Sequence, residues 1–317
     1  MRNLTSKIMV SVCLVFFSHS FKAQTTAQEF YEKAKQKIEQ KDYQYAATLI
    51  DKAIVLDEAN INYKLLKANL DWALKHYEDA FITIKKARQI NPKFAETYNL
   101  FGTFYQSSFQ PDSAIYMYNL AIKYAQTDSS KYSYLNNRGV VKWLYRDFNS
   151  ALIDYKEVLA KYPNDTNSLN MIGQLYKDMG DTVKAIETMK MVLQINNKSI
   201  VGNVNLGLLY SEIDSLDRSL QCFNNALKLQ PDEPLVYSNR GFTYYKMKRY
   251  NEALKDINKS IEMYPENSYA YKNLALVYFA QNNISEGCTA LHYAERYGYE
   301  TNYGDEVKKL KEKYCKN

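Results

Sequence analysis

The sequence predicts an all-α solenoid, a stack of about eight helix-turn-helix units closed by a C-terminal helix. Three observations predict it. Small residues recur at steps of 34 along most of the chain. Apolar residues are spaced by three and four, as on one face of a helix. Only ten glycines and six prolines occur among 317 residues, less than half the average share of about 12%, which disfavours a many-stranded β fold.

The repeat is defined by two series of small residues. The first series is Ala34, Ala68, Gly102, Gly139, Gly173, Gly207, Gly241 and Ala275. The second series, twelve residues later, is Ala46, Ala80, Ala114, Ala151, Ala185, Ser219, Ala253 and Gly287. Both series contain the same single longer step, of 37 residues. We interpret these three extra residues, near 126–131, as a lengthened loop between repeats.

A unit of this length is too short to bury a core of its own, so it forms two antiparallel helices that stack on their neighbours. A small residue on the first helix lets the second helix approach closely. Apolar spacing agrees, for example at Leu206, Leu209 and Tyr210 on the first helix of one unit. Proline ends the second helix in four units, at Pro92, Pro163, Pro231 and Pro265.

The order of small residue, aromatic residue three positions later, second small residue and proline resembles the tetratricopeptide repeat family. It is clearest in residues 200–267. The resemblance covers residues 27–301 and implies a right-handed superhelical solenoid. Its eight repeats are 27–60, 61–94, 95–131, 132–165, 166–199, 200–233, 234–267 and 268–301. The first two repeats depart from the family pattern, because Lys37 and Asp71 stand where the aromatic residue belongs.

Residues 302–317 are predicted to form a capping helix over the last repeat. Asp305 can cap its first turn, and Val307, Leu310 and Tyr314 fall on one face with lysines on the others. Cys315 follows Cys288 of the last repeat by about one repeat length, so we expect a Cys288–Cys315 disulfide that stabilises this end. Two buried thiols are the alternative.

Residues 1–23 have the three-part layout of a secretory signal peptide. Arg2 and Lys7 precede an apolar run at 8–17, and a more polar stretch ends at Ala23. The run is shorter than the ~20 residues of a membrane-spanning helix, although an uncleaved anchor remains the alternative. We therefore expect an exported protein, periplasmic or associated with a bacterial cell envelope, that meets the membrane only through this signal or through partners.

Charge and motif content exclude several function classes. The 41 basic and 35 acidic residues nearly balance, and removal of residues 1–23 would lower the net charge from +6 to +3, so we expect no nucleic-acid partner. The sequence contains no glycine-rich phosphate loop, HExxH or CxxC motif. Only three histidines occur, at His19, His76 and His292. We therefore expect no cofactor, no metal site and no enzymatic activity.

In the family, the first helix of each repeat lines a concave groove. Two residues before the small residue stand Asn137, Asn205, Asn239 and Asn273. The resemblance implies that such an asparagine ladder can hold a peptide backbone, because each amide offers a donor and an acceptor. Met171 interrupts this row. Asparagine is also common here in family members without a known ligand, which is the alternative interpretation.

Four residues after the small residue stand Trp72, Trp143, Tyr245 and Phe279. They also face the expected groove and could grip apolar or proline-rich segments; alternatively, they only pack against neighbouring helices. A complete clamp for a C-terminal carboxylate is absent. Together these features predict a non-catalytic exported scaffold that binds protein or peptide segments. The alternatives are a structural component of an envelope assembly and an accessory subunit that presents substrate to a separate enzyme. The sequence identifies neither the partner nor the oligomeric state.

Overall fold

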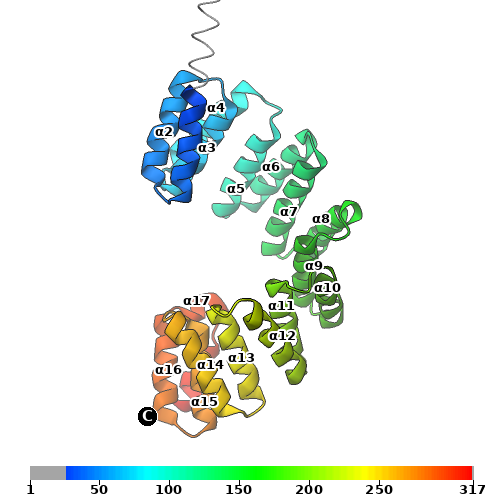
Figure 1. Ribbon diagram of the computed structural model, residues 1–317, viewed down its shortest axis with the longest axis vertical. Coiled ribbons are helices and arrows are strands. Elements are labelled where there is room, and N and C mark those ends of the chain that lie inside the picture. Colours follow the sequence, from blue (N-terminus) through cyan, green and yellow to red (C-terminus); the bar gives the residue numbers. More distant parts are fainter. Residues whose placement is uncertain (1–25, 316–317) are drawn as a thin grey trace, which may run out of the picture. The chain divides into compact units, whose positions relative to one another are not determined.

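The computed structural model describes residues 26–315, and all regular secondary structure within them is helical (Figure 1). The predicted signal peptide at residues 1–23 lies outside the described residues. The predicted all-α architecture of stacked hairpins with a C-terminal helix is confirmed. The chain divides into two compact units, Met1–Glu157 and Val158–Asn317.

The first unit is a row of antiparallel hairpins. Its helices are one over residues 26–39, α2 (Tyr43–Leu56), α3 (Ile61–Ala73), α4 (Tyr77–Ile90), α5 (Ala95–Ser107), α6 (Pro111–Tyr124), α7 (Asp128–Leu144) and the first part of α8 (Phe148–Lys161). In each hairpin an odd-numbered helix, or the helix at 26–39, comes first and is followed by an even-numbered one. Each pair buries its apolar stripe between its own two helices and the next hairpin.

The second unit continues the same pattern and ends in two shorter helices. After α8 come α9 (Thr166–Asp178), α10 (Thr182–Ile195), α11 (Ile200–Glu212), α12 (Leu216–Leu229), α13 (Pro234–Lys246), α14 (Tyr250–Met263), α15 (Ser268–Ala280), α16 (Ile284–Arg296), α17 (Tyr299–Tyr303) and α18 (Glu306–Tyr314). The predicted capping helix corresponds to α18, and α17 is an additional turn of helix before it.

The two helices of each hairpin approach closely at the small residues. A Cβ atom added to Gly207 would lie 2.8 Å from the ring of Phe223, and one added to Gly102 would lie 2.7 Å from the ring of Tyr118. In the first two hairpins alanine replaces glycine, and the residues equivalent to Phe223 are the smaller Ile50 and Ile84, both fully buried. These four pairs combine a smaller residue on one helix with a larger one on the other, whereas Gly241 faces Ile257, with an added Cβ atom 2.7 Å from Ile257 Cγ1.

A left-handed residue reverses the chain between the helices of every hairpin. The non-glycine examples are Lys41, Lys75, Phe109, Arg146, Asp214, Lys248 and Asn282, with φ between 57° and 65°. In the first hairpin Asp42 N donates to Lys37 O at 2.9 Å, and Lys41 N donates to Ile38 O at 2.9 Å. These bonds satisfy carbonyls at the end of the first helix. In the remaining hairpin the left-handed residue is Gly180, and glycine adopts this conformation without strain.

The interpretation of the three extra residues as a longer loop is wrong. Helix α6 ends at Tyr124 and α7 begins at Asp128, so three residues connect them, whereas four connect the other repeats. Instead, α7 has 17 residues where the other first helices from α3 to α15 have 13. The Thr127 side chain accepts a hydrogen bond from Ser130 N. This N-cap starts the helix early, so the polar stretch lengthens α7 at its N-terminus.

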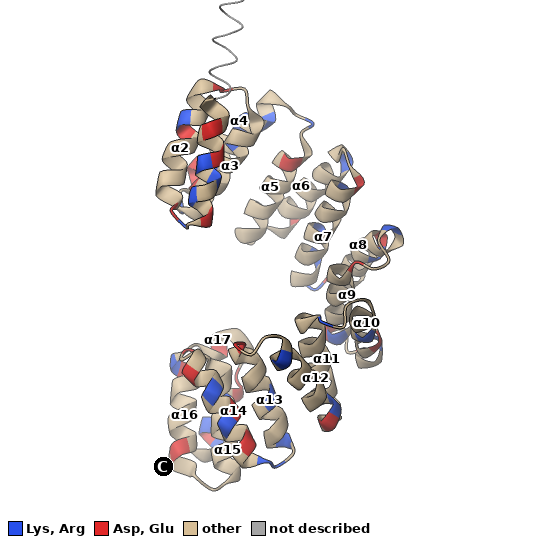
Figure 2. Cartoon of the chain, in the orientation of Figure 1, with Lys and Arg blue, Asp and Glu red and all other residues tan. Residues whose placement is uncertain are grey.

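Basic and acidic residues are interspersed along the helices of both units (Figure 2). Several of them form ion pairs between neighbouring turns or helices, such as Lys67 with Asp51 and Lys177 with Glu212. Within residues 26–315, no helix combines the length and apolar character that crossing a bilayer requires.

We expect Gly207→Ala to destabilise the second unit by about 1 kcal/mol. Overpacking against Phe223, about 1–3 kcal/mol, exceeds the gain in helix propensity of about 1 kcal/mol. Combining it with Phe223→Ile recreates the alanine–isoleucine pairing of the first hairpins. Urea unfolding of the four proteins in this double-mutant cycle should give a favourable coupling of about 1 kcal/mol. Additive effects of the two substitutions would contradict this account of the close approach.

Candidate functional site

The predicted asparagine row lies on the first helices of four hairpins. Asn137 Nδ2 on α7 donates to Asn99 Oδ1 on α5 at 2.8 Å. Asn205 Oδ1 on α11 accepts from Gln174 Nε2 on α9 at 3.4 Å. Both bonds connect successive first helices of one unit. Asn239 on α13 is partly buried, like Asn137 and Asn205, so these three residues remain accessible in part.

Asn273 differs from the other three asparagines because it is fully buried. Its Nδ2 lies 3.3 Å from Ser238 Oγ and 3.4 Å from Ser238 O, so it ties α15 to α13. Its Oδ1 has no hydrogen-bond partner among the described residues. A ladder that contacts a ligand directly therefore stays a prediction, and it is centred on Asn205 and Asn239 in the second unit.

The four aromatic residues of the predicted groove also differ in accessibility. Trp72 is partly buried and stacks on Phe104, with ring centroids 4.3 Å apart. Trp143 and Tyr245 are partly buried as well. Phe279 is only 7% exposed. Direct contact between these rings and a ligand stays a prediction, and Phe279 is covered by another part of the chain.

The C-terminal segment covers the start and the end of α15. Tyr314 of α18 stacks on Phe279 at 4.2 Å with an interplanar angle of 15°. At the other end Glu306 lies 3.5 Å from Lys272 Nζ and accepts a hydrogen bond from Tyr299 Oη at 2.8 Å. Helix α18 therefore runs alongside α15 in the same direction, and it occupies the face of α15 that carries Lys272 and Phe279.

A disulfide holds this segment in place. Cys288 on α16 is bonded to Cys315, with Cα atoms 5.7 Å apart. Val307 is fully buried, and Leu310 packs on the same core cluster. Asp305 stands at the start of α18, but its carboxylate pairs with Lys309 at 2.9 Å instead of capping a backbone N–H.

Lys272 is a buried ammonium enclosed by aromatic rings. Its Nζ lies 4.6 Å from the ring centre of Tyr269, 4.9 Å from that of Phe242 and 5.9 Å from that of Tyr299. Burial lowers the pKa of Lys272, and the Glu306 carboxylate opposes this change. Burial, with Glu306 nearby, raises the pKa of Tyr269 to about 12. Rings and one carboxylate thus replace the water around this charge.

Two buried ion pairs in the stack were not predicted from the sequence. Arg138 binds both oxygens of Asp154, at 3.0 and 2.7 Å, and also donates to Asn119 of the preceding hairpin at 2.6 Å. Arg240 repeats this arrangement with Asp256, at 2.6 and 2.8 Å, and with Asn224 at 2.8 Å. The sequence pattern that could have predicted these ion pairs is an arginine directly before the small residue, with an aspartate sixteen positions after the arginine.

Three aspartates and one free thiol are buried in the part of the chain that the structure describes. Asp154 and Asp256 are bound by arginine, and the third buried aspartate, Asp71, pairs with Lys67 at 3.2 Å. Cys222 is the free thiol of the described residues, and burial raises the pKa of its side chain to about 11, which disfavours the reactive thiolate. Residues 26–315 contain no group of three acidic, histidine or cysteine side chains arranged to hold a metal ion.

Family models for the tetratricopeptide repeat match residues 166–199 and 234–267, and a further TPR repeat model matches residues 207–248. The chain contains tetratricopeptide repeats. A tetratricopeptide repeat protein from Parabacteroides merdae ATCC 43184 is 20% identical, with a TM-score of 0.57 over 90% of this chain and 98% of that one. No curated protein sequence matches the chain.

A second solved structure has the same fold over much of its length. In the APC/C hetero-tetramer Cut9–Hcn1, one chain is 15% identical to this one, with a TM-score of 0.61. The match covers 87% of this chain and 54% of that chain. At these identities both solved structures support the tetratricopeptide repeat fold alone.

Replacing the two cysteines tests whether the disulfide holds the C-terminal segment against the last repeat. We expect Cys288→Ser/Cys315→Ser to lower the stability of the C-terminal segment by on the order of 3 kcal/mol, because the bond closes a loop of 27 residues. Hydrogen exchange should show lost protection in α18, with α9 of the same unit as the internal control. Unchanged protection in α18 would mean that the Phe279–Tyr314 and Lys272–Glu306 contacts suffice.

Proposed function

We propose that this protein is an exported, non-catalytic scaffold that binds protein or peptide segments along the first helices of its repeats. Proteins built from tetratricopeptide repeats commonly act as protein-interaction scaffolds. The observation that carries the proposal is the chain's own C-terminal segment. On α15, the predicted groove residue Phe279 stacks on a ring of this segment, and Lys272, which was not predicted as a groove residue, pairs with its Glu306.

On the two preceding first helices of the second unit, the positions of Lys272 and Phe279 are buried or half-buried against the next hairpin, but the position of Tyr269 is exposed. Val201 on α11 and Leu235 on α13 occupy the position of Tyr269 on α15, and they are 55% and 49% exposed. By contrast, Tyr269 packs against Tyr303 of α17, with ring centres 5.5 Å apart. Apolar side chains that are covered in one repeat and exposed in two others fit a surface that a partner covers.

Polar groups on this face suit an extended backbone. Asn205 Nδ2 and both polar atoms of the Asn239 amide have no hydrogen-bond partner among the described residues. Their spacing of one repeat allows each amide to bind a different peptide unit. We infer that α11 and α13 bind an extended segment through backbone hydrogen bonds, with Val201 and Leu235 contacting its apolar side chains.

The asparagine pair can be tested with peptides selected from a displayed library by the wild-type protein. We expect Asn205→Ala/Asn239→Ala to weaken binding about tenfold, since each lost hydrogen bond contributes about 0.5–1.5 kcal/mol. Fluorescence anisotropy with the selected peptides gives the dissociation constants. The matched control is Asn225→Ala/Asn251→Ala, which removes two exposed amides from second helices of the same unit. Equal affinities of both variants would contradict a role for the row.

Export is tested separately with a reporter. Residues 1–30 fused to alkaline phosphatase, which is active only outside the bacterial cytoplasm, should give an active enzyme. Leu14→Arg should abolish that activity by placing a charge in the apolar run. N-terminal sequencing of the exported fusion should begin at Gln24. An inactive wild-type fusion, or activity unaffected by Leu14→Arg, would rule out a signal peptide.

A further inference from the structure

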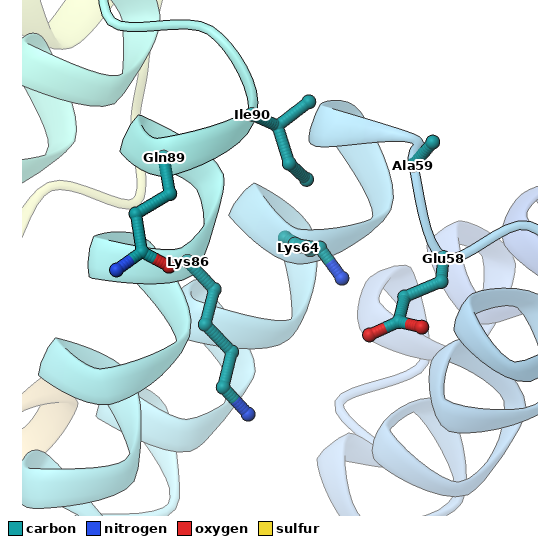
Figure 3. A pocket seen from close by; sticks show the side chains of 6 residues that line it. All are labelled: Glu58, Ala59, Lys64, Lys86, Gln89 and Ile90. Atoms are coloured by element: carbon teal, nitrogen blue, oxygen red, sulfur yellow. The ribbon is translucent and has the colours of Figure 1, made fainter.

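A pocket of about 540 Å³ opens in the first unit, away from the predicted groove. It lies between the turn that precedes α3 and the end of α4. Its lining residues are Glu58, Ala59, Lys64, Lys86, Gln89 and Ile90. Figure 3 shows the charged side chains around one opening, with Ala59 and Ile90 along its rim.

Lys64 is the unusual member of this set. The residue is only 5% exposed, yet its ammonium has no hydrogen bond or ion pair with any other residue in the part of the chain that the structure describes. The other strongly buried lysine, Lys272, has Glu306 at 3.5 Å and three aromatic rings around it. The nitrogen itself is not among the fully buried unpaired atoms, so the ammonium reaches the pocket opening, where a ligand can compensate its charge.

The next repeat carries a different residue at this position. Tyr98 holds the position of Lys64 there and is 6% exposed. Its hydroxyl donates to Pro92 O at 2.6 Å, and its ring packs against Tyr124 at 5.5 Å. Pro92 and Tyr124 are the equivalents of Glu58 and Ile90. Pockets at the same place in other hairpins are lined by Phe30, Tyr237 and Tyr271, so Lys64 does not create the pocket but gives it an ammonium in its wall.

The charges that line the pocket define the ligand it suits. Lys64 and Lys86 contribute two positive charges, and Glu58 contributes one negative charge. Asp57 lies near enough to act on Lys64 but does not line the pocket, and its carboxylate accepts a hydrogen bond from Asn60 at 3.4 Å. Burial lowers the pKa of Lys64, while Glu58 opposes this and Lys86 adds to it. A single negative charge would balance the lining, whereas a dianion would exceed it.

We propose that this pocket binds the carboxylate of a small or peptide ligand, with Lys64 and Lys86 as its cationic partners. Gln89 can donate to the same group, and Ile90 and Ala59 provide an apolar rim for the carbon atoms next to it. The site is built from the turn before α3 and the end of α4. It therefore goes beyond the proposed function, and neither depends on the other.

The test uses the full mature protein labelled with ¹³C at the lysine ε-carbons and follows the Lys64 resonance by NMR. The probes are N-acetylglycine, neutral N-acetylglycinamide and inorganic phosphate. We expect a saturable shift with N-acetylglycine, a rise in the Lys64 pKa on binding, and no saturable shift with N-acetylglycinamide. Equal responses to the acid and the amide, or tighter binding of phosphate, would overturn the assignment.

Substitutions of single lysines test whether N-acetylglycine binds at this pocket. We expect Lys64→Met to weaken N-acetylglycine binding about tenfold or more, because a charge-assisted contact is lost. Lys64→Tyr, which copies the tyrosine of the next repeat, should have the same effect. In both variants the NMR resonance of Lys86 reports binding. The matched control is Lys85→Met, which removes an equal charge from the exposed neighbouring position and should change binding less than twofold. If Lys85→Met weakened binding as much as Lys64→Met, the effect would be nonspecific and the proposal would fail.

A further substitution covers the case in which Lys64 variants do not fold. Glu58 is exposed, so Glu58→Gln should preserve the fold, and it removes a repulsive charge from the opening. We expect about two- to fivefold tighter binding of N-acetylglycine, and unchanged or weaker binding would count against the site.

Comparing a tetra-alanine peptide that has a free C-terminus with an amidated peptide carrying one internal glutamate distinguishes the two peptide sources of the carboxylate.

Discussion

The close approach of two helices within each hairpin is the constraint on which the rest of the structure depends. Gly207 and Gly102 leave no room for a Cβ atom beside Phe223 and Tyr118. Where the first helix carries alanine, as at Ala68, the facing residue is the smaller Ile84. Gly241 also faces an isoleucine, Ile257, and an added Cβ atom would lie 2.7 Å from it, so the close contact at the small residue is what spaces the hairpins and brings equivalent positions into line.

That alignment explains which polar residues the stack tolerates. Once neighbouring helices are correctly spaced, a charge at a normally apolar position is acceptable if a partner stands in reach. Arg240 satisfies this condition through Asp256 and Asn224, and Arg138 does so through Asp154 and Asn119. Lys64 does not, because it faces an open pocket in which the Glu58 carboxylate forms no ion pair with it. The contrast separates polar residues that hold the stack together from one that is available to a ligand.

The C-terminal segment links architecture to function. It buries the last first-helix face through Tyr314 and Glu306, and the Cys288–Cys315 bond fixes its end. A stack of repeats needs such a cover at its end to protect its apolar face from water. On α15 this segment is held by an ion pair at Lys272 and by an aromatic stack at Phe279. At the position of Tyr269, α11 and α13 carry the exposed apolar residues Val201 and Leu235.

The sequence by itself determined the repeat length, the helical hairpins and the residues that share a helix face, because these follow from local periodicity and side-chain size. It also predicted which cysteines could meet. Only the tertiary structure decided that Asn273 and Phe279 are covered while Asn205 stays accessible in part. It also decided that the extra residues lengthen α7. The physical reason is that burial depends on which distant segment lies over a face, and a repeating pattern assigns the same face to covered and uncovered repeats alike.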